Sequence, residues 1–484
     1  MMRKCIAAYG MILMLGAMLA LASPPAVAQA QQAANPPYSL AEYNAYQAAA
    51  GQTNPQAKIQ ACDDFVAKFP KSVLIPLIDE LYYNAYNLAK NYPKVIESVD
   101  QFMAIPDDSF TKLNITKEAI LGKRLTALYY RALAFNQSFK ETDPNAQDEL
   151  TKARQDALQG LTMLGQLSKP ANMNDDQFAQ QKKPLIILFN YTAGSASYQT
   201  KDYKSAIDSF NAELAENPTD AATYFRTGVA YLQLAAKQAP QAPAAGGSAP
   251  PTPPAGAAAD PAEQASDLYL NGFWDVARAI GLKGQGEAQM RSYLRAQMFN
   301  YEQPACGTLL DQQMDELVQL ATNAPARPAT YSIPSAADLG KVLQASNLIS
   351  ILGDLEAGGD KAKTTWLAAC GQEIPNVVGK IIDVTPGAPD NSTVDIKVFT
   401  AATGEAIMAG TAANLDVTVA GQPDAATLEK GNQIKFTGTL AKYDAQPLLV
   451  YFDKGKVDPS SFPTEKKEKV PGKKKPGATE RGRG

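Results

Sequence analysis

The fold is decided by residues 187–220, ILFNYTAGSASYQTKDYKSAIDSFNAELAENPTD, and by the sequence AATYFRTGVAYLQL of residues 221–234 that follows. Small and apolar residues recur three and four positions apart on both sides of residues 201–203, which is the spacing of two amphipathic helices joined by a turn. The small residues Gly194 and Gly228 would let neighbouring helices approach closely. The sequence therefore predicts one helix-turn-helix unit of 34 residues and the first helix of a second copy.

This unit resembles the tetratricopeptide repeat, which has a small residue at position 8, Ala at position 20, an aromatic residue at position 24 and Pro at position 32. The signature positions that fit are Ala193, Gly194, Ala206, Phe210 and Pro218. Three positions depart from the pattern, with Asn190, Ser197 and Glu213 in place of a large apolar residue, Tyr and Ala. The resemblance implies a solenoid of helical hairpins that binds proteins on its concave side. The alternative is an ordinary α-hairpin with small packing residues.

The chain is expected to be mainly α, with a solenoid of tetratricopeptide type over residues 38–237, because degenerate hairpins with helical spacing precede the clear copy. Residues 238–263 contain seven Pro and ten Ala and no large apolar side chain. They are expected to form a flexible insertion within the second copy, and a domain boundary is the alternative. Residues 264–322 are expected to hold the end of the solenoid and its capping helices, and residues 323–373 a helical connector.

The hydrophobic period changes to two over residues 374–457, where about five short stretches alternate apolar and polar residues. This pattern predicts a small antiparallel β-barrel or sandwich. Residues 430–438, KGNQIKFTG, resemble a strand of the OB fold, which implies an OB-like domain. Residues 463–484 hold eight basic residues and three Glu among Pro and Gly, and they are expected to form a disordered basic tail.

The first 30 residues have the features of a secretory signal peptide. Arg3 and Lys4 precede an apolar stretch over residues 6–22, and small residues permit cleavage after Ala28 or Ala30. The mature chain is therefore expected in a bacterial periplasm or secreted. An uncleaved membrane anchor is the alternative.

Three cysteines remain after such a cleavage. In an oxidising compartment one pair is expected to form a disulfide. Cys306 and Cys370 are the favoured pair because they flank the same helical segment. Cys62 lies on an apolar helical face, where it is expected to act as a small buried hydrophobe.

No catalytic residue, metal site or cofactor is expected. The chain contains no His, which removes His-dependent triads, His metal ligands and the commonest general base. Three scattered cysteines cannot form a zinc site with four Cys ligands. The Gly-rich residues 281–286 lack the order of a phosphate-binding loop and are interpreted as a turn between helices. The sequence therefore favours a protein that is not an enzyme.

The resemblance places particular positions of each first helix on the concave side. In the two copies it indicates a largely aromatic and apolar binding groove, formed by Tyr191, Tyr198, Phe225, Val229 and Leu232. Such a wall suits an apolar helix or extended segment. Apart from Arg226, it lacks the basic and Asn residues of the peptide-tail clamps in the family. The alternative is that another helix of this chain covers these side chains.

These expectations describe a non-enzymatic interaction scaffold of the cell envelope whose partner is a protein or peptide. The alternative is a ligand-binding module in which the β-domain takes an oligosaccharide or a cell-wall fragment. Nucleic acid is not an expected partner, because residues 374–457 hold seven Lys against nine Asp and Glu, whereas binding of single strands needs a positive groove. The basic tail is expected either to be solvated or to make a weak, salt-dependent contact with anionic envelope components.

Overall fold

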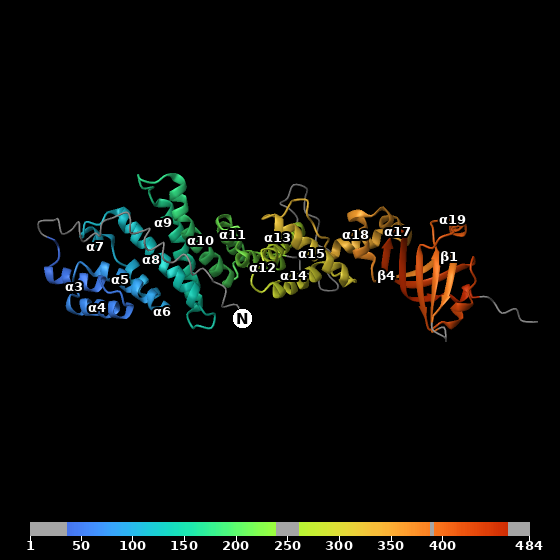
Figure 1. Cartoon of the computed structure of the whole chain (residues 1–484), viewed down its shortest axis with the longest axis horizontal. Helices are drawn as coiled ribbons and strands as arrows, with labels where there is room; N and C mark the ends of the chain where they lie inside the picture. The colour runs from blue at the N-terminus through green and yellow to red at the C-terminus, as the bar shows by residue number, and fades with distance from the viewer. Residues whose placement is uncertain (1–35, 239–260, 388–391, 463–484) are drawn as a thin grey trace, which may run out of the picture. The chain divides into compact units, whose positions relative to one another are not determined.

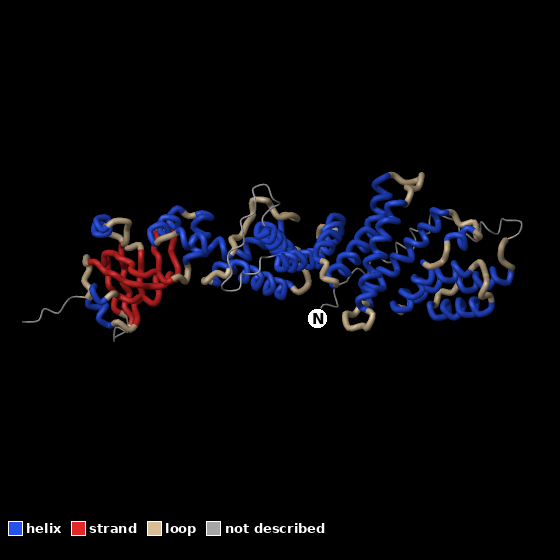
Figure 2. Tube along the Cα trace, turned by 180° about the vertical axis from the view of Figure 1, so that it is seen from behind, coloured by secondary structure: helices blue, strands red, loops and turns tan. Residues whose placement is uncertain are grey.

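The computed structural model describes residues 36–238, 261–387 and 392–462, and within these ranges it contains 17 α-helices and five β-strands (Figure 1). All helices except one precede the first strand, and Figure 2 shows the helices in blue and the strands in red. The mainly helical fold followed by a small barrel is thus confirmed. The expected signal peptide, the basic tail and residues 239–260 of the expected insertion lie outside the described residues.

The chain divides into two compact units. The first consists of Met1–Gln297 with Gln313–Ser332, and the second of Met298–Gln312 with Ile333–Gly484. Within the described ranges, no helix combines the length and the apolar character that crossing a membrane would require.

The first unit begins with successive helices joined by short turns (Figure 1). They are α3 (Leu40–Ala50), α4 (Pro55–Lys68), α5 (Ile75–Leu88), α6 (Tyr92–Met103) and the short α7 (Asp107–Thr111). Side chains cap their starts: Ser39 forms a capping box with Glu42, and Asn54 accepts from two backbone N–H groups of α4. Their shared core is aromatic, with the ring of Tyr83 5.5 Å from that of Phe102 in an edge-to-face arrangement.

A buried ion-pair cluster joins α6 to the next two helices, α8 (Lys117–Ser138) and α9 (Ala146–Gln166). The Arg131 side chain is 4% exposed, and its Nε lies 2.6 Å from a carboxylate oxygen of Asp156 and 3.1 Å from one of Asp100. Lys152 lies 2.8 Å from the other oxygen of Asp156. Because every charge in the cluster has an opposite partner, the interior tolerates them.

The stretch that predicted the repeat forms α10 (Asp175–Gln199), α11 (Tyr203–Glu216) and α12 (Ala221–Gln238). The expected close approach is present, because a Cβ on Gly194 would lie 2.6 Å from the Phe210 ring of α11. Ala206 is fully buried beside it. The helix lengths depart from a strict 34-residue repeat. α10 begins at Asp175, well before residue 187, because Asn174 and Gln177 form a capping box upstream.

The next helices are α13 (Pro261–Gly281), α14 (Glu287–Glu302) and α15 (Gly307–Asn323). The end of α14 and the start of α15 fall within Met298–Gln312 and so belong to the second unit. Residues 281–286 form the expected turn between helices. The start of α13 corrects the expected insertion, since Pro261 suits the first position of a helix and residues 261–263 are helical. Arg278 of α13 donates to the carbonyl oxygens of Ala321 and Thr322, two of the acceptors that the end of α15 leaves free.

In the second unit α16 (Ala336–Ala345), α17 (Leu348–Ala357) and α18 (Gly359–Ala369) lead into the barrel. The strands are β1 (Glu373–Pro386), β2 (Thr393–Phe399), β3 (Leu415–Ala420), β4 (Gln433–Ala445) and β5 (Leu448–Val457). Between them lie α19 (Gly404–Ala409) and the 3₁₀ turn η2 (Pro423–Thr427), and η3 (Pro459–Ser461) follows β5. The barrel is closed in the order β1-β2-β3-β5-β4, a five-stranded Greek-key arrangement of the kind found in OB folds. All pairs are antiparallel except β3 with β5, which corrects the expectation of a purely antiparallel domain.

The helices expected to be a connector are part of the barrel unit. Ile351, Leu355 and Trp366 belong to the same buried cluster as the inward residues of the strands. The Trp366 ring lies 4.9 Å from the ring of Tyr443 on β4. The apolar faces of these helices pack against one another and against the barrel, so α16, α17 and α18 lie in the second unit.

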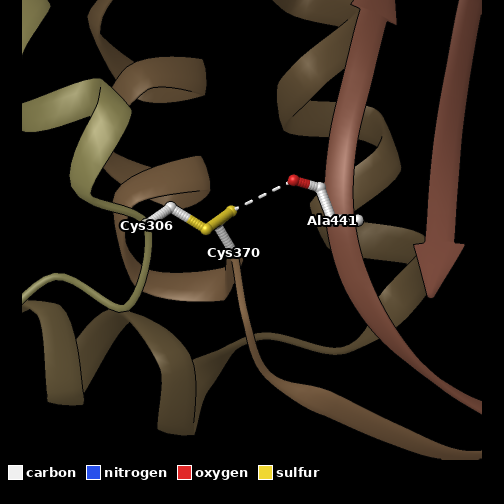
Figure 3. Close-up of a disulfide and its surroundings, with 3 residues drawn as sticks. All are labelled: Cys306, Cys370 and Ala441. Carbon is white, nitrogen blue, oxygen red and sulfur yellow. Dashed lines mark hydrogen bonds between the residues drawn. A yellow bond between two sulfur atoms is a disulfide. The ribbon is translucent and has the colours of Figure 1, made fainter. Parts of the chain in front are cut away.

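One disulfide, between Cys306 and Cys370, closes a loop with a sequence separation of 64 (Figure 3). It joins the residue before α15 to the residue after α18, with the two Cα atoms 5.9 Å apart. This is the pair that the sequence favoured. The Cys370 sulfur lies 3.5 Å from the carbonyl oxygen of Ala441. It could donate a hydrogen bond to this oxygen only as a free thiol. Cys62 is free and buried, as expected, and burial raises the pKa of its thiol to about 12.

Candidate functional site

The strongest candidate site is a set of aromatic side chains on α10, α12 and α14. The helices come from separate parts of the chain, and the ring contacts described below bring them together. We call Tyr191, Tyr198, Phe225 and Tyr293, together with Arg226, the aromatic face. All five side chains are half-buried.

Arg226 and Tyr191 connect α12 to α10. The Arg226 guanidinium carbon lies 5.2 Å from the centre of the Tyr191 ring, within the range of a cation–π contact. The same ring lies 6.4 Å from that of Phe210 on α11. Tyr191 therefore contacts both a core residue and a cation.

Phe225 and Tyr293 connect α12 to α14. Their rings are 5.7 Å apart and nearly perpendicular. Burial raises the pKa of Tyr293 to about 12, and the nearby Tyr198 hydroxyl raises it further, so the two phenols lie in one environment. Tyr198 also packs on Tyr203, with ring centres 5.7 Å apart. First helices of three successive hairpins thus contribute to one surface.

The other two residues expected in the groove differ from each other. Val229, one turn after Phe225, is half-buried and lies beside the aromatic face on α12. Leu232 is only 2% exposed, and a Cβ on Gly272 of α13 would lie 2.6 Å from it. Leu232 therefore belongs to the interface between α12 and α13, which corrects its expected place in a binding surface.

Beneath this region lies a buried carboxylate. Glu213 of α11 is fully buried, and it accepts a hydrogen bond from the Asn217 side chain at 3.2 Å. Its Oε2 has no hydrogen-bond partner in the structure. Burial and the neighbouring Asp220 carboxylate together raise the pKa of Glu213 to about 7, although the Asn217 hydrogen bond and Arg226 act in the opposite direction. The sequence marked Glu213 only as a departure from the repeat pattern.

The outer surface of the barrel has a different character. Lys397 on β2 is paired in register with Asp383 on β1 and with Asp416 on β3, so charges of both signs alternate across the strands. Tyr451 on β5 holds the Lys442 ammonium 4.2 Å from its ring centre and donates a hydrogen bond to Asp444. Such a mixed surface does not provide the positive groove that nucleic acid needs.

The other aromatic side chains of the barrel sequence are used in packing. Phe436 and Phe452 are 1% exposed, and their rings are perpendicular to each other in the core. Tyr443 packs against Trp366. The Phe399 ring occupies the space in which a Cβ on Gly410 would lie. The aromatic surface that sugar binding would use is therefore limited, among these residues, to the half-buried Tyr451.

Chemistry of other kinds finds little support in the part of the chain that the structure describes. Its Cys, Asp and Glu side chains form no group of three that could hold a metal ion. A cavity of about 520 Å³ lies at the start of α10. Mainly Asn, Gln and Asp side chains line it, with Met173 among them, and all come from residues 172–181 of one helix start and its preceding turn. Such a local, polar hollow is no substrate site by itself.

Comparison of the chain with protein-family models, with curated proteins and with solved structures found no match in any of the three.

The sequence located three of the five residues of the aromatic face, namely Tyr191, Tyr198 and Phe225. It noted Arg226 as the one basic residue near the groove, but it did not place Tyr293 there. Helical spacing of Met290, Tyr293 and Leu294 was visible, yet the interruption after α12 concealed that α14 continues the row of first helices.

Proposed function

We propose that this protein is a non-enzymatic adaptor of the tetratricopeptide type, which holds an apolar peptide or helix of a partner protein on the aromatic face. One observation carries the proposal: half-buried rings from three helices meet on one surface around Arg226. Aromatic and Arg side chains in such positions are the residues that most often dominate protein interfaces. The helical-hairpin architecture and the small residues at helix contacts support the assignment to this repeat class.

Substitution of the aromatic residues should abolish binding of the partner. In the double variant Tyr198→Ala/Phe225→Ala we expect the loss of proteins that wild type retains from a periplasmic extract. A matched control is Tyr82→Ala/Tyr86→Ala, which deletes another half-buried pair whose rings are 5.9 Å apart on α5. Both variants must first show wild-type helical circular dichroism. If the folded Tyr198→Ala/Phe225→Ala variant keeps every partner, the aromatic face is not the binding site.

We also propose that the chain is exported and acts in the bacterial cell envelope. The support is the charged start, the apolar stretch and the small-residue cleavage sites of residues 1–30, together with a disulfide, which is typical of an oxidising compartment. Sequencing the N-terminus of the exported protein should give Gln29 or Gln31. An intact Met1 in a membrane fraction would instead identify the segment as an anchor.

The ligand-binding alternative for the barrel is less well supported. It would rest on Tyr451, because the other barrel aromatics are packed in the interior or against neighbouring residues. Tyr451→Ala is the variant that tests it, with binding of soluble cell-wall fragments as the measurement.

A further inference from the structure

Arg226 differs from the other arginines of the described structure. Six of these donate hydrogen bonds to carboxylates, hydroxyls or carbonyl oxygens, and they are Arg124, Arg131, Arg154, Arg278, Arg291 and Arg327. For Arg226, the described ranges supply the ring of Tyr191 but no carboxylate within ion-pair distance and no hydrogen-bond acceptor. Arg226 is half-buried, and its guanidinium nitrogens are not among the buried, unpartnered polar atoms of the described residues, so they remain open to a partner.

The contact with Tyr191, 5.2 Å from the guanidinium carbon to the ring centre, uses none of the N–H groups of Arg226 in a hydrogen bond to an acceptor. Those N–H groups form the fork that matches the two oxygens of a carboxylate. Tyr191 thus holds the cation in place and leaves the hydrogen-bonding edge for a partner.

Nearby acidic groups do not cancel this charge. Glu213, the carboxylate on which Arg226 acts, is fully buried, and burial raises its pKa, which favours its neutral form over the charge that would offset Arg226. The carboxylate of Asp220 is occupied by the backbone N–H groups of Ala222 and Thr223 and by the Thr223 hydroxyl. Arg226 is thus the cation that contacts a ring of the aromatic face. Glu141 acts on Tyr198, and Lys237 lies 4.4 Å from the ring of Tyr203, which packs on Tyr198.

We propose that the segment bound on the aromatic face carries an acidic side chain, Asp or Glu, close to its apolar residues, and that this carboxylate pairs with Arg226. The inference rests on the proposed function and specifies the chemistry of its partner. An acidic side chain within the segment is chosen over a free C-terminal carboxylate because one Arg, without further cations beside it, cannot surround a chain end.

The test begins with a displayed library of random 12-residue peptides, selected on the full mature chain. Enriched peptides are expected to combine Trp, Phe or Leu with an Asp or Glu within one helical turn. One such peptide is then synthesised with an amidated C-terminus, and its affinity is measured by fluorescence anisotropy. Amidation should leave the affinity unchanged, whereas loss of binding on amidation would assign the carboxylate to the chain end and overturn the proposal.

Two substitutions isolate the ion pair. With wild-type protein, replacing the acidic residue of the peptide by its amide should weaken binding about tenfold or more. With the acidic peptide, Arg226→Gln should weaken binding to a similar degree. Both changes together should weaken it no further than either alone. Lys204→Gln removes one charge from an exposed position on α11 and should have no effect. The peptide exchange needs no protein variant, so it decides the matter even if Arg226→Gln fails to fold.

The outcomes separate the two proposals. Selected peptides that bind through Tyr198 and Phe225, but without an acidic residue and without response to Arg226→Gln, would overturn this inference and leave the proposed function standing. Selected peptides that bind the Tyr198→Ala/Phe225→Ala variant as well as wild type would overturn both. Recovery of an Arg226→Glu variant by a peptide with Lys in place of its acidic residue would be the strongest support.

Discussion

The two compact units are stabilised in different ways. In the helical unit, buried residues form several clusters, each shared by helices that follow one another in the chain. In the barrel unit, one cluster combines α17, α18 and strands that lie far apart in the sequence. The helical unit also contains a buried ion-pair cluster, and the barrel unit contains the disulfide.

This difference predicts how far the effect of a destabilising substitution extends in each unit. When each hairpin contacts mainly its neighbours, stability is approximately a sum of local terms, and a single defect loosens one part of the array. A barrel core made of distant strands forms or is lost as a whole. The chain contains two tryptophans, Trp274 in the helical unit and Trp366 in the barrel unit. Their fluorescence therefore follows the unfolding of each unit separately. Trp366→Phe and Trp274→Phe backgrounds isolate each signal.

The largest effect is expected from Asp156→Ala. It would leave the Arg131 guanidinium, 4% exposed, beside Lys152 with only the half-exposed Asp100 to offset both charges. Breaking one partner of a buried pair costs about 3–5 kcal/mol. Urea unfolding followed by Trp274 fluorescence should show the loss. As the control, Asp208→Ala breaks the exposed Lys204 pair and should cost at most about 1 kcal/mol. Equal effects of the two variants would show that the buried cluster has no special weight.

Removal of the disulfide should come next, and it should act on the barrel unit. Both cysteines belong to that unit, and the bond closes a loop with a sequence separation of 64. Loss of such a bond costs about 2–4 kcal/mol. The Trp366 transition should therefore fall on reduction of wild type, and the Cys306→Ala/Cys370→Ala variant should not respond to reductant. A variant that still responds to reductant would direct attention to Cys62.

Glu213 should make the helical unit sensitive to pH. Its pKa is about 7 in the folded protein against an ordinary value of 4.5, so between these values the folded state binds more protons than the unfolded state. Stability should therefore fall as the pH rises from about 4.5 to about 7 and be level above, by a total on the order of 3 kcal/mol.

The measurement is the difference between wild type and Glu213→Gln in unfolding free energy at a series of pH values. That difference should change across this window, whereas Glu216→Gln, a half-exposed residue of the same helix, should give a flat difference. A flat curve for Glu213→Gln would mean that the carboxylate is solvated in solution.

Overpacking of the repeat should have the smallest effect. Gly194→Leu and Ala206→Leu place side chains where α10 and α11 already touch, and each should cost about 1–3 kcal/mol. Gly122→Leu on α8 provides the matched control, because a Cβ there would have no neighbour within 4 Å. Neutral behaviour of Gly194→Leu and Ala206→Leu in thermal unfolding would remove the main support for the repeat class.

The sequence predicted most where a pattern was both local and periodic. Alternation in residues 374–457 gave all five strands, because each strand has one buried side, as Val394, Ile396 and Val398 show. Small residues at Gly194 and Gly228 predicted the close helix contacts. The upstream extension of α10 depended on the cap at Asn174, a signal that the repeat register did not contain.

What the sequence could not provide was the pairing of distant segments. The helices of residues 323–373 pack on the barrel, and their apolar residues alone do not say which surface covers them. Likewise Leu232 falls at a position that the repeat pattern turns toward the concave side, but Gly272 brings α13 close enough to bury it. Tyr293 joins the aromatic face for the same reason, since only the folded chain brings α14 next to Phe225.

The contact between α12 and α13 has a practical consequence. A Cβ on Gly228 would lie 2.8 Å from the backbone oxygen of Gly272, and one on Gly272 would lie 3.0 Å from that of Gly228, so the two helices recognise each other through their backbones. Lengthening the segment that connects two such helices costs little free energy, about 0.6 kcal/mol for each doubling of its length. The junction between Gln238 and Pro261 is thus a suitable place to graft a fluorescent or affinity domain, so that the protein and its partners can be followed in living cells while both helices keep their pairing.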